Sequence, residues 1–296
     1  MHFLEHGYVL IRRAFEPQQA ADFSADLWPR LGYSPHDRGT WTKERIHLPP
    51  TSLPPSAPST GAGGQKKREH CKTFAPKAWR AICALLGGES RVDSENSGFI
   101  SDAFIVNLGV PGSAPQDGMR SDGNPHALGD WHVDGDFFVH FLDSREQALL
   151  VVPLFSDIAP GGGGTVIACD SIAHVASHLH QRPEGVQPGF GGNGWFVRTA
   201  RQCDRFCELT GEAGDVVLLH PLMLHSASRN YSRVPRVITN PRVALREPFA
   251  YGRDGSELSL VERKTLLELR VDRLNDWHIT GQRRGVVPAR LQKKAA

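Results

Sequence analysis

Apolar and polar positions along this chain alternate in short runs, and long stretches with helical spacing are few. The runs that read as strands are bounded by Gly, Pro or polar turn residues, and they lie at 7–11, 102–107, 131–140, 148–155, 164–168, 194–198, 215–220 and 236–244. Short strands at such spacing are typical of β-sandwiches and barrels. The pattern therefore predicts a mainly β protein.

Three segments have helical rather than strand character. One follows Glu16-Pro17, because proline is favoured in the first turn of a helix, and its core side would be formed by Ala20, Phe23, Leu27 and Trp28. A second spans 74–86 and stops at Gly87-Gly88. A third begins at about residue 260, where Ser259 and Glu262 form a capping-box pattern. With no internal repeat, we expect one domain over 1–296 with helices flanking the β core.

The segment 49–70 has a composition unlike the rest of the chain. Up to Gly64 it is dominated by Pro, Ser, Thr and Gly. Loops of this length without periodicity are usually functional or disordered, so a flexible loop or lid is expected here. Trp41 lies shortly before this segment and is a candidate to cover a substrate pocket; ordinary aromatic packing is the alternative.

Charge and cysteine content narrow the class of protein. The 296 residues include 34 basic and 32 acidic side chains, a net charge of +2, which gives no indication of binding to nucleic acid or to a membrane surface. Five scattered cysteines do not form a disulfide framework and favour a reducing compartment. No apolar run could cross a bilayer, and the N-terminus lacks a signal-peptide layout. We expect a cytoplasmic monomer or homodimer whose partner is a small molecule.

The most informative chemical motif is His132-Val133-Asp134. Side chains repeat with period two along a strand, so His132 and Asp134 would share one side and could bind one ion. Two histidines and one carboxylate suit ferrous iron and leave open coordination positions. The third ligand would be His220 or His225, and periodicity does not choose between them because Pro221 interrupts regular pairing.

Arg236 bears on that choice. It opens a β-run after Pro235, and arginine offers a planar, permanently charged grip on a carboxylate. Its position shortly after His225 favours His225 as the third ligand. His220 would then be a structural histidine behind the site.

At this point the chain resembles a known family. The segments Trp131–Asp134 and Gly214–Ser226 are similar to the iron- and 2-oxoglutarate-dependent oxygenases of the phytanoyl-CoA dioxygenase family. The similarity extends, more weakly, over most of residues 7–245. It implies a double-stranded β-helix (jelly-roll, cupin-like) core flanked by helices. It also implies that His132, Asp134 and His225 bind Fe(II), and that Arg236 binds the far carboxylate of 2-oxoglutarate.

The resemblance also suggests further contacts, and the chain departs from the family pattern at Ala227 and at Cys169-Asp170-Ser171. Asn107 and Thr165 are candidates to hydrogen-bond 2-oxoglutarate; the alternatives are a turn-capping Asn and a β-forming Thr. Relatives often carry a small hydroxyl residue two positions beyond the distal histidine, where this chain has Ala227, and Ser226 or Ser228 could substitute. Dioxygen is the co-substrate, and ascorbate is a candidate reductant.

Substrate contacts are expected on the face that carries the ligands. Asp136, Phe138 and His140 follow Asp134 at period two and would line the same inner face. Buried polar residues there are costly unless they are used, so substrate contact is one interpretation. For Asp136 the alternative is to orient a metal-bound histidine.

These features together predict a dioxygenase that oxidises, and most simply hydroxylates, a C–H bond of a small, largely apolar molecule, as in secondary metabolism. Succinate and CO2 would be released. Halogenating relatives lack a carboxylate at the position of Asp134. One alternative is a non-redox cupin-type protein that holds zinc or nickel, which would have no need of Arg236. The other is a catalytically silent binding protein, which would have no need of the complete ligand set.

Overall fold

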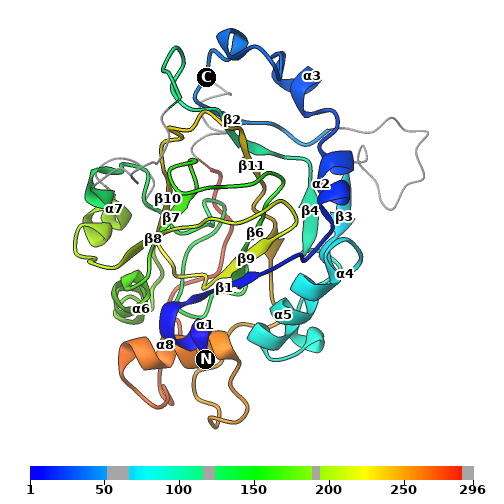
Figure 1. Cartoon of the computed structure of the whole chain (residues 1–296). Helices are drawn as coiled ribbons and strands as arrows, with labels where there is room; N and C mark the ends of the chain where they lie inside the picture. Colours follow the sequence, from blue (N-terminus) through cyan, green and yellow to red (C-terminus); the bar gives the residue numbers. More distant parts are fainter. Residues whose placement is uncertain (52–66, 116–123, 189–193, 289–296) are drawn as a thin grey trace.

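The computed structural model describes residues 1–51, 67–115, 124–188 and 194–288 (Figure 1). Its α-helices are α1 His2–His6, α2 Pro17–Phe23, α3 Leu27–Leu31, α4 Cys71–Phe74, α5 Pro76–Leu86, α6 Ser171–His180, α7 Trp195–Ala200 and α8 Leu260–Leu269. Its strands are β1 Tyr8–Ile11, β2 Arg45–His47, β3 Arg68–His70, β4 Phe99–Ser101, β5 Ile105–Asn107, β6 Leu149–Pro153, β7 Thr165–Ala168, β8 Phe206–Glu208, β9 Val216–Leu219, β10 His225–Ala227, β11 Arg236–Ile238 and β12 Arg242–Val243. Short 3-10 turns lie at Arg38–Thr40, Glu89–Arg91 and Pro125–Ala127.

The strands form antiparallel sheets, two of which meet at the end of β6. One sheet has the order β1-β9-β6-β12, and another has the order β11-β5-β2. Just beyond β6, Leu154 pairs with Ile238, and the Phe155 amide donates to the Val237 carbonyl at 2.9 Å. β11 therefore continues the first sheet, and β5 and β2 extend it further.

A third sheet, with the order β10-β7-β8, is extended on the β10 side by a bridge between His132 and His225. Helices cover the outside of the strands: α6 and α7 lie beside β7 and β8, α4 and α5 lie on the opposite flank, and α1 and α8 cross one end (Figure 1). The helices thus cover the outer faces of the sheets.

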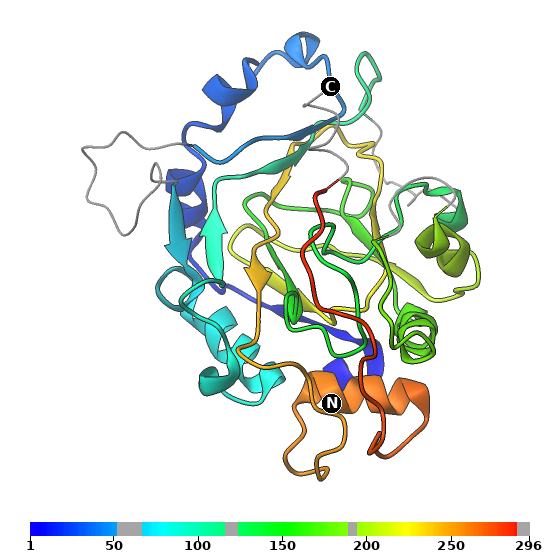
Figure 2. The same cartoon turned by 180° about the vertical axis from the view of Figure 1, so that it is seen from behind.

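The last described segment runs along the back of the strands. In Figure 2 the red trace rises from the α8 end toward the opposite end of the molecule. It is anchored to the stretch that follows the His132 motif, because the Val139 amide donates to the Arg284 carbonyl at 3.1 Å and the Val286 amide donates to the Phe137 carbonyl at 2.8 Å. The segment therefore supports the chain just beyond Asp134.

The expectation of a mainly β chain with helices is confirmed, and most predicted strand runs contain an observed strand. The run at 236–244 divides into β11 and β12. Pro241 lies in the break, and proline has no amide hydrogen to continue a ladder. The expected helix after Pro17 divides at Ser24, whose hydroxyl bonds the Ala20 carbonyl at 2.7 Å, into α2 and α3.

Two strand predictions are wrong. Residues 194–198 begin helix α7, whose buried side consists of Phe196, Val197 and Ala200 at helical spacing. Residues 131–140 form isolated bridges rather than a strand. The break is at Gly135, whose φ of +117° is accessible to glycine, and a Cβ there would lie 2.3 Å from the Phe138 ring.

The structure also bears on the expected loop at 49–70, on the capping box at Ser259 and on the five cysteines. Most of the expected loop at 49–70 lies outside the described residues, and its last part, Arg68–His70, is strand β3 paired with β4. Helix α8 begins after Ser259, and both hydrogen bonds of its capping box are formed. The five cysteines are all free. Within the described ranges, no helix is long and apolar enough to cross a membrane.

The capping box predicts a stability effect. Replacing Ser259 by Ala removes the hydroxyl that accepts from the Glu262 amide at 3.2 Å, so the free energy of unfolding should fall by about 1 kcal/mol. Ser256→Ala, at an exposed position in the preceding turn, is the control and should change it by less than about 0.5 kcal/mol. Urea denaturation measures both, and equal midpoints for the two variants would contradict the capping role.

Candidate metal centre

The two histidines of the centre face each other across a backbone bridge. The His132 amide donates to the His225 carbonyl at 3.0 Å, and the His225 amide donates to the His132 carbonyl at 2.9 Å. Residues directly opposite in an antiparallel pair project their side chains to the same face. The ladder therefore sets the distance between the rings, whose centroids lie 4.3 Å apart.

Backbone carbonyls orient both rings. His132 Nδ1 lies 2.7 Å from the Asp130 carbonyl oxygen, and His225 Nδ1 lies 3.2 Å from the Met223 carbonyl oxygen. A carbonyl only accepts, so each Nδ1 carries a proton, and each Nε2 is the ring atom left to face Asp134 or to bind an ion. Those Nε2 atoms lie 3.6 and 3.5 Å from Asp134 Oδ1. The three ligand atoms lie within 4.8 Å of one another, as one ion requires.

Asp134 brings a largely buried negative charge to the cluster. Burial raises the pKa of this carboxyl, but hydrogen bonds and charge from His132 and His225 outweigh burial and hold the pKa far below its usual range. Burial lowers the pKa of His132, and Asp134 more than reverses that effect. Asn240 Nδ2 donates to Asp134 Oδ2 at 3.3 Å, which leaves Oδ1 for the ion. An N,N,O donor set around a buried anion fits a divalent transition metal such as ferrous iron.

His220 lies elsewhere. Its Nε2 is 3.0 Å from Thr265 Oγ1 and 3.3 Å from the Val261 carbonyl, and its Nδ1 accepts from the Leu222 amide at 3.2 Å. Burial lowers its pKa to about 3, so the ring is neutral. It ties the end of β9 to α8. Of the two candidate third ligands, the structure therefore brings His225, and not His220, to His132 and Asp134.

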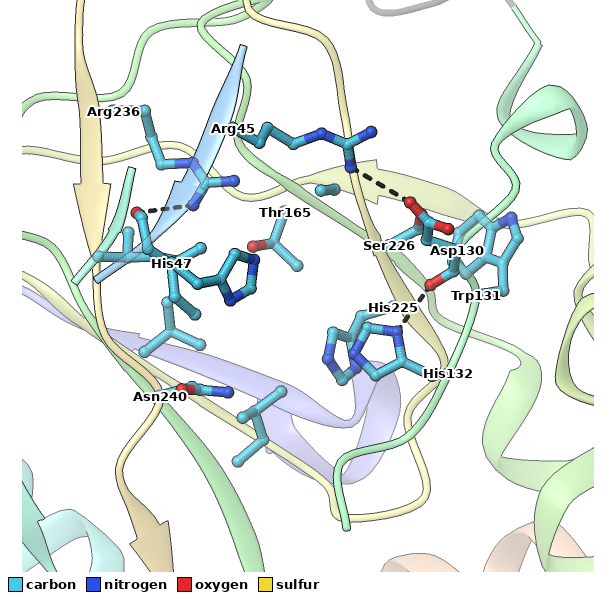
Figure 3. A pocket seen from close by; sticks show the side chains of 15 residues that line it. Arg45, His47, Asp130, Trp131, His132, Thr165, His225, Ser226, Arg236 and Asn240 are labelled. Carbon is cyan, nitrogen blue, oxygen red and sulfur yellow. Dashed lines mark hydrogen bonds and ion pairs between the residues drawn. The ribbon is translucent and has the colours of Figure 1, made fainter. Parts of the chain in front are cut away.

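A cavity of about 370 Å³ opens beside the metal ligands. In Figure 3 the rings of His132 and His225 lie at one end, Arg236 lies across from them, and Thr165 lies between. Strands of both sheet groups contribute to its wall. The lining residues other than these four are Arg45, His47, Ile105, Asp130, Trp131, Leu150, Val152, Ser226, Ala227, Ile238 and Asn240.

Arg236 is a buried cation in this wall, only 2% exposed. Its Nε donates to the Gly163 carbonyl at 2.8 Å and its Nη1 donates to the Ile105 carbonyl at 3.3 Å. Burial lowers its pKa to about 10; the charge of Arg45 lowers it too, and that of Glu208 raises it. Within the described chain both bonds go to neutral carbonyls. A buried guanidinium held in this way favours an anion inside the cavity.

Hydroxyl groups lie near the same wall. Thr165 lines the cavity and stands opposite Ala227 in the β7–β10 register. Ser226 also lines the cavity, and its buried Oγ has no hydrogen-bond partner among the described residues. Ser228 instead donates to the Gly164 carbonyl at 2.7 Å. Thr165 is therefore the hydroxyl residue that shares the face of Ala227 on the cavity wall.

Asn107 does not line the cavity. It stands opposite Arg236 in the β5–β11 register, but its Nδ2 donates to the Ser228 carbonyl at 2.9 Å and its Oδ1 accepts from the Gly109 amide at 3.1 Å. Its side chain therefore fixes the surrounding backbone and is not directed at a ligand.

The four expected substrate contacts also lie outside the cavity lining. Phe138 and His140 stack with centroids 4.5 Å apart and pack behind Asp134, and burial lowers the pKa of His140 to about 4. Asp136 follows the Gly135 turn, which breaks the period-two alternation. Trp41 is buried, and its ring stacks on Trp28 with centroids 5.5 Å apart. It therefore packs in the core, which was the alternative to covering the pocket.

Several lining residues were not predicted from the sequence. Arg45 and His47 come from the short strand β2, and Arg45 Nη1 lies 3.3 Å from Asp130 Oδ2 across the cavity rim (Figure 3). Asn240 lies just past β11. Strand β2 is only three residues long, Arg45–His47, so its polar-apolar alternation is too short to mark it in the sequence.

Comparison with known proteins gives only distant similarities. No family model and no curated protein matches the chain. One similar solved structure is the epimerase SnoN in complex with Fe3+, alpha ketoglutarate and nogalamycin RO (15% identity, TM-score 0.40, 82% of this chain and 80% of that one). Another is HygX from Streptomyces hygroscopicus with nickel, 2-oxoglutarate and hygromycin B bound (10%, 0.40, 82% and 84%). A third is a putative oxidoreductase from Salmonella typhimurium LT2 (12%, 0.47, 94% and 78%). Similarities this weak leave the interpretation to the chain's own residues.

The two histidines should respond differently to substitution. His225→Ala removes a ligand and should abolish tight binding of Fe(II), measured by anaerobic titration calorimetry. His220→Ala should leave that affinity unchanged and lower the free energy of unfolding by about 1–3 kcal/mol, because buried partners of the ring lose their hydrogen bonds. Normal iron binding by His225→Ala, or its loss in a folded His220→Ala protein, would overturn the ligand set.

Proposed function

We propose that this chain is an Fe(II)- and 2-oxoglutarate-dependent dioxygenase of the phytanoyl-CoA dioxygenase type. The observation that carries the proposal is that one cavity is lined by the two histidines of the candidate metal cluster and by a buried guanidinium. The His132–Asp134–His225 cluster lies at one end, and the Arg236 guanidinium lies at the other. An N,N,O cluster suits ferrous iron, and a buried guanidinium suits a carboxylate. 2-oxoglutarate has a metal-chelating end and a carboxylate at the far end.

The strand order supports the jelly-roll core of such enzymes. One sheet group runs β1-β9-β6-β11-β5-β2 through the Leu154–Ile238 bridge, and the other runs from the His132 bridge through β10-β7-β8. Two facing antiparallel sheets with a site between them are the arrangement that a double-stranded β-helix requires. We propose that the chain is a single domain of this type.

The residues around the cavity have different roles in the proposed reaction. Bound ferrous iron supplies the redox chemistry with dioxygen, and His132, Asp134 and His225 would hold it. Arg236 binds the far carboxylate of 2-oxoglutarate, with the Thr165 hydroxyl as a donor beside it. Aliphatic side chains wall the space between these ends, namely Ile105, Leu150, Val152 and Ile238. The overall reaction converts substrate C–H, O2 and 2-oxoglutarate to C–OH, succinate and CO2.

The residues at the rim of the cavity indicate the chemistry of the expected substrate. Arg45, Asp130 and Asn240 place polar groups around the opening, and the inner wall is mostly aliphatic. We propose a small molecule whose apolar part reaches the metal and whose polar groups meet the rim. Asp134 fills the ligand position that halide would need, so the proposed outcome is hydroxylation.

Arg236 gives the most direct functional test. Arg236→Gln removes a charge-assisted contact with the far carboxylate, which contributes about 1.5–3 kcal/mol, so the KM for 2-oxoglutarate should rise by about ten- to a hundredfold. Succinate formation at saturating Fe(II), ascorbate and oxygen is the assay. Arg242→Gln, on β12 and outside the cavity lining, is the matched control and should keep the wild-type KM. An unchanged KM in Arg236→Gln would refute the role.

His132→Ala and Asp134→Ala test the metal part of the proposal separately. Each removes one ligand atom of the cluster, so each should abolish iron-dependent succinate formation even at high 2-oxoglutarate. Activity near the wild-type level in either folded variant would show that the iron is bound elsewhere.

A further inference from the structure

The carbonyl that fixes Arg236 belongs to a turn of glycines, residues 161–164, which we call the glycine turn. Gly163 supplies the carbonyl that accepts from Arg236 Nε at 2.8 Å. The turn needs glycine, because Gly161 and Gly163 have φ values of +74° and +81°. Such a turn has no side chains of its own to hold it in place. The direction of the guanidinium therefore depends on whatever anchors these four residues.

One carboxylate anchors both ends of the glycine turn. Glu208 Oε2 accepts from the Gly161 amide at 2.8 Å, and Glu208 Oε1 accepts from the Gly164 amide at 2.9 Å. Bonds from backbone amides to a charged acceptor are about twice as strong as neutral ones. Glu208 ends strand β8, which pairs with β7 directly beyond the turn. The Glu208 side chain therefore attaches the glycine turn to the β7–β8 sheet.

Close packing prevents the turn from shifting. A Cβ on Gly164 would lie 2.3 Å from the Leu209 carbonyl oxygen and 2.9 Å from Glu208 Cγ. A Cβ on Gly163 would lie 2.6 Å from Asn107 Nδ2 on the other side. The turn is therefore enclosed between β8 and β5. Glu208 accepts from the amides at both of its ends, while the carbonyls there accept from Tyr231 N at 3.0 Å and Ser228 Oγ at 2.7 Å.

We propose that Glu208 is a positioning residue for Arg236: it holds the glycine turn so that the Gly163 carbonyl directs the guanidinium at the far carboxylate of 2-oxoglutarate. The inference rests on the proposed function for the identity of that anion. Both Glu208 oxygens bind backbone amides, so it acts through the turn. The metal ligands lie on other segments and should be unaffected.

Two keto acids separate this role from a general structural one. 2-Oxoglutarate and 2-oxopentanoate share the metal-chelating end and the chain length, but 2-oxopentanoate lacks the far carboxylate. Glu208→Gln replaces one accepting oxygen by an amide NH2. It should raise the Kd of 2-oxoglutarate about tenfold and leave that of 2-oxopentanoate unchanged. Anaerobic calorimetry on the Fe(II)-loaded protein measures both Kd values. Glu212→Gln, which alters an exposed carboxylate, is the control.

The outcomes distinguish this inference from the proposed function. If wild-type protein binds both keto acids equally, the proposed function fails and the inference fails with it. If wild type prefers 2-oxoglutarate and Glu208→Gln keeps that preference, or weakens both keto acids equally, only the inference is overturned. In an Arg236→Gln background, Glu208→Gln should add no further loss, and an additive loss would contradict the coupling. Should Glu208→Gln fail to fold, Ser228→Ala removes the neighbouring bond to the Gly164 carbonyl and should shift the same ratio in the same direction.

Discussion

Two opposite charges determine the architecture of this site: Asp134, beside the histidines that line one end of the cavity, and the buried Arg236 at the other end. Asp134 is held as an anion by two histidines, and Arg236 is held as a cation by backbone carbonyls. Either charge would be costly to bury alone, since a desolvated ion needs a counter-charge or strong dipoles. A metal ion at one end and a ligand carboxylate at the other would satisfy both. The sheets, the glycine turn and the bridge between His132 and His225 all serve to hold these groups in place.

Much of the β core could be predicted because its strands carry local signals. The apolar runs that contain β1, β5, β6, β7 and β9 have the length and the turn residues that mark strands, and the α8 capping box marks that helix. The stretch after Asp134 could not be predicted in this way. Its alternation continues through Gly135, but the positive φ at that glycine turns the chain away. Asp136, Phe138 and His140 consequently leave the face that simple periodicity assigned to them.

Long-range pairing explains what else the sequence could not show. His132 and His225 meet because their strands pair, and His220 points to α8 although it lies only five positions from His225. Arg45 reaches the cavity because β2 adds to the edge of β5, a partnership that no local pattern reveals. Asn107 stands opposite Arg236 in the strand register, yet its side chain forms hydrogen bonds with backbone groups and not with the cavity. Residue type and order were sufficient to predict the cluster of His132, Asp134 and His225. The other residues around the cavity depend on strand pairing that the sequence does not reveal.

The most direct test of the central claim is an anaerobic optical titration of the wild-type protein with ferrous iron followed by 2-oxoglutarate. A visible charge-transfer band should appear only when both are present. It should saturate at one equivalent of each per chain, because the described residues place one candidate metal cluster and the Arg236 guanidinium around the same cavity. A protein that binds iron but develops no such band with 2-oxoglutarate would contradict the account.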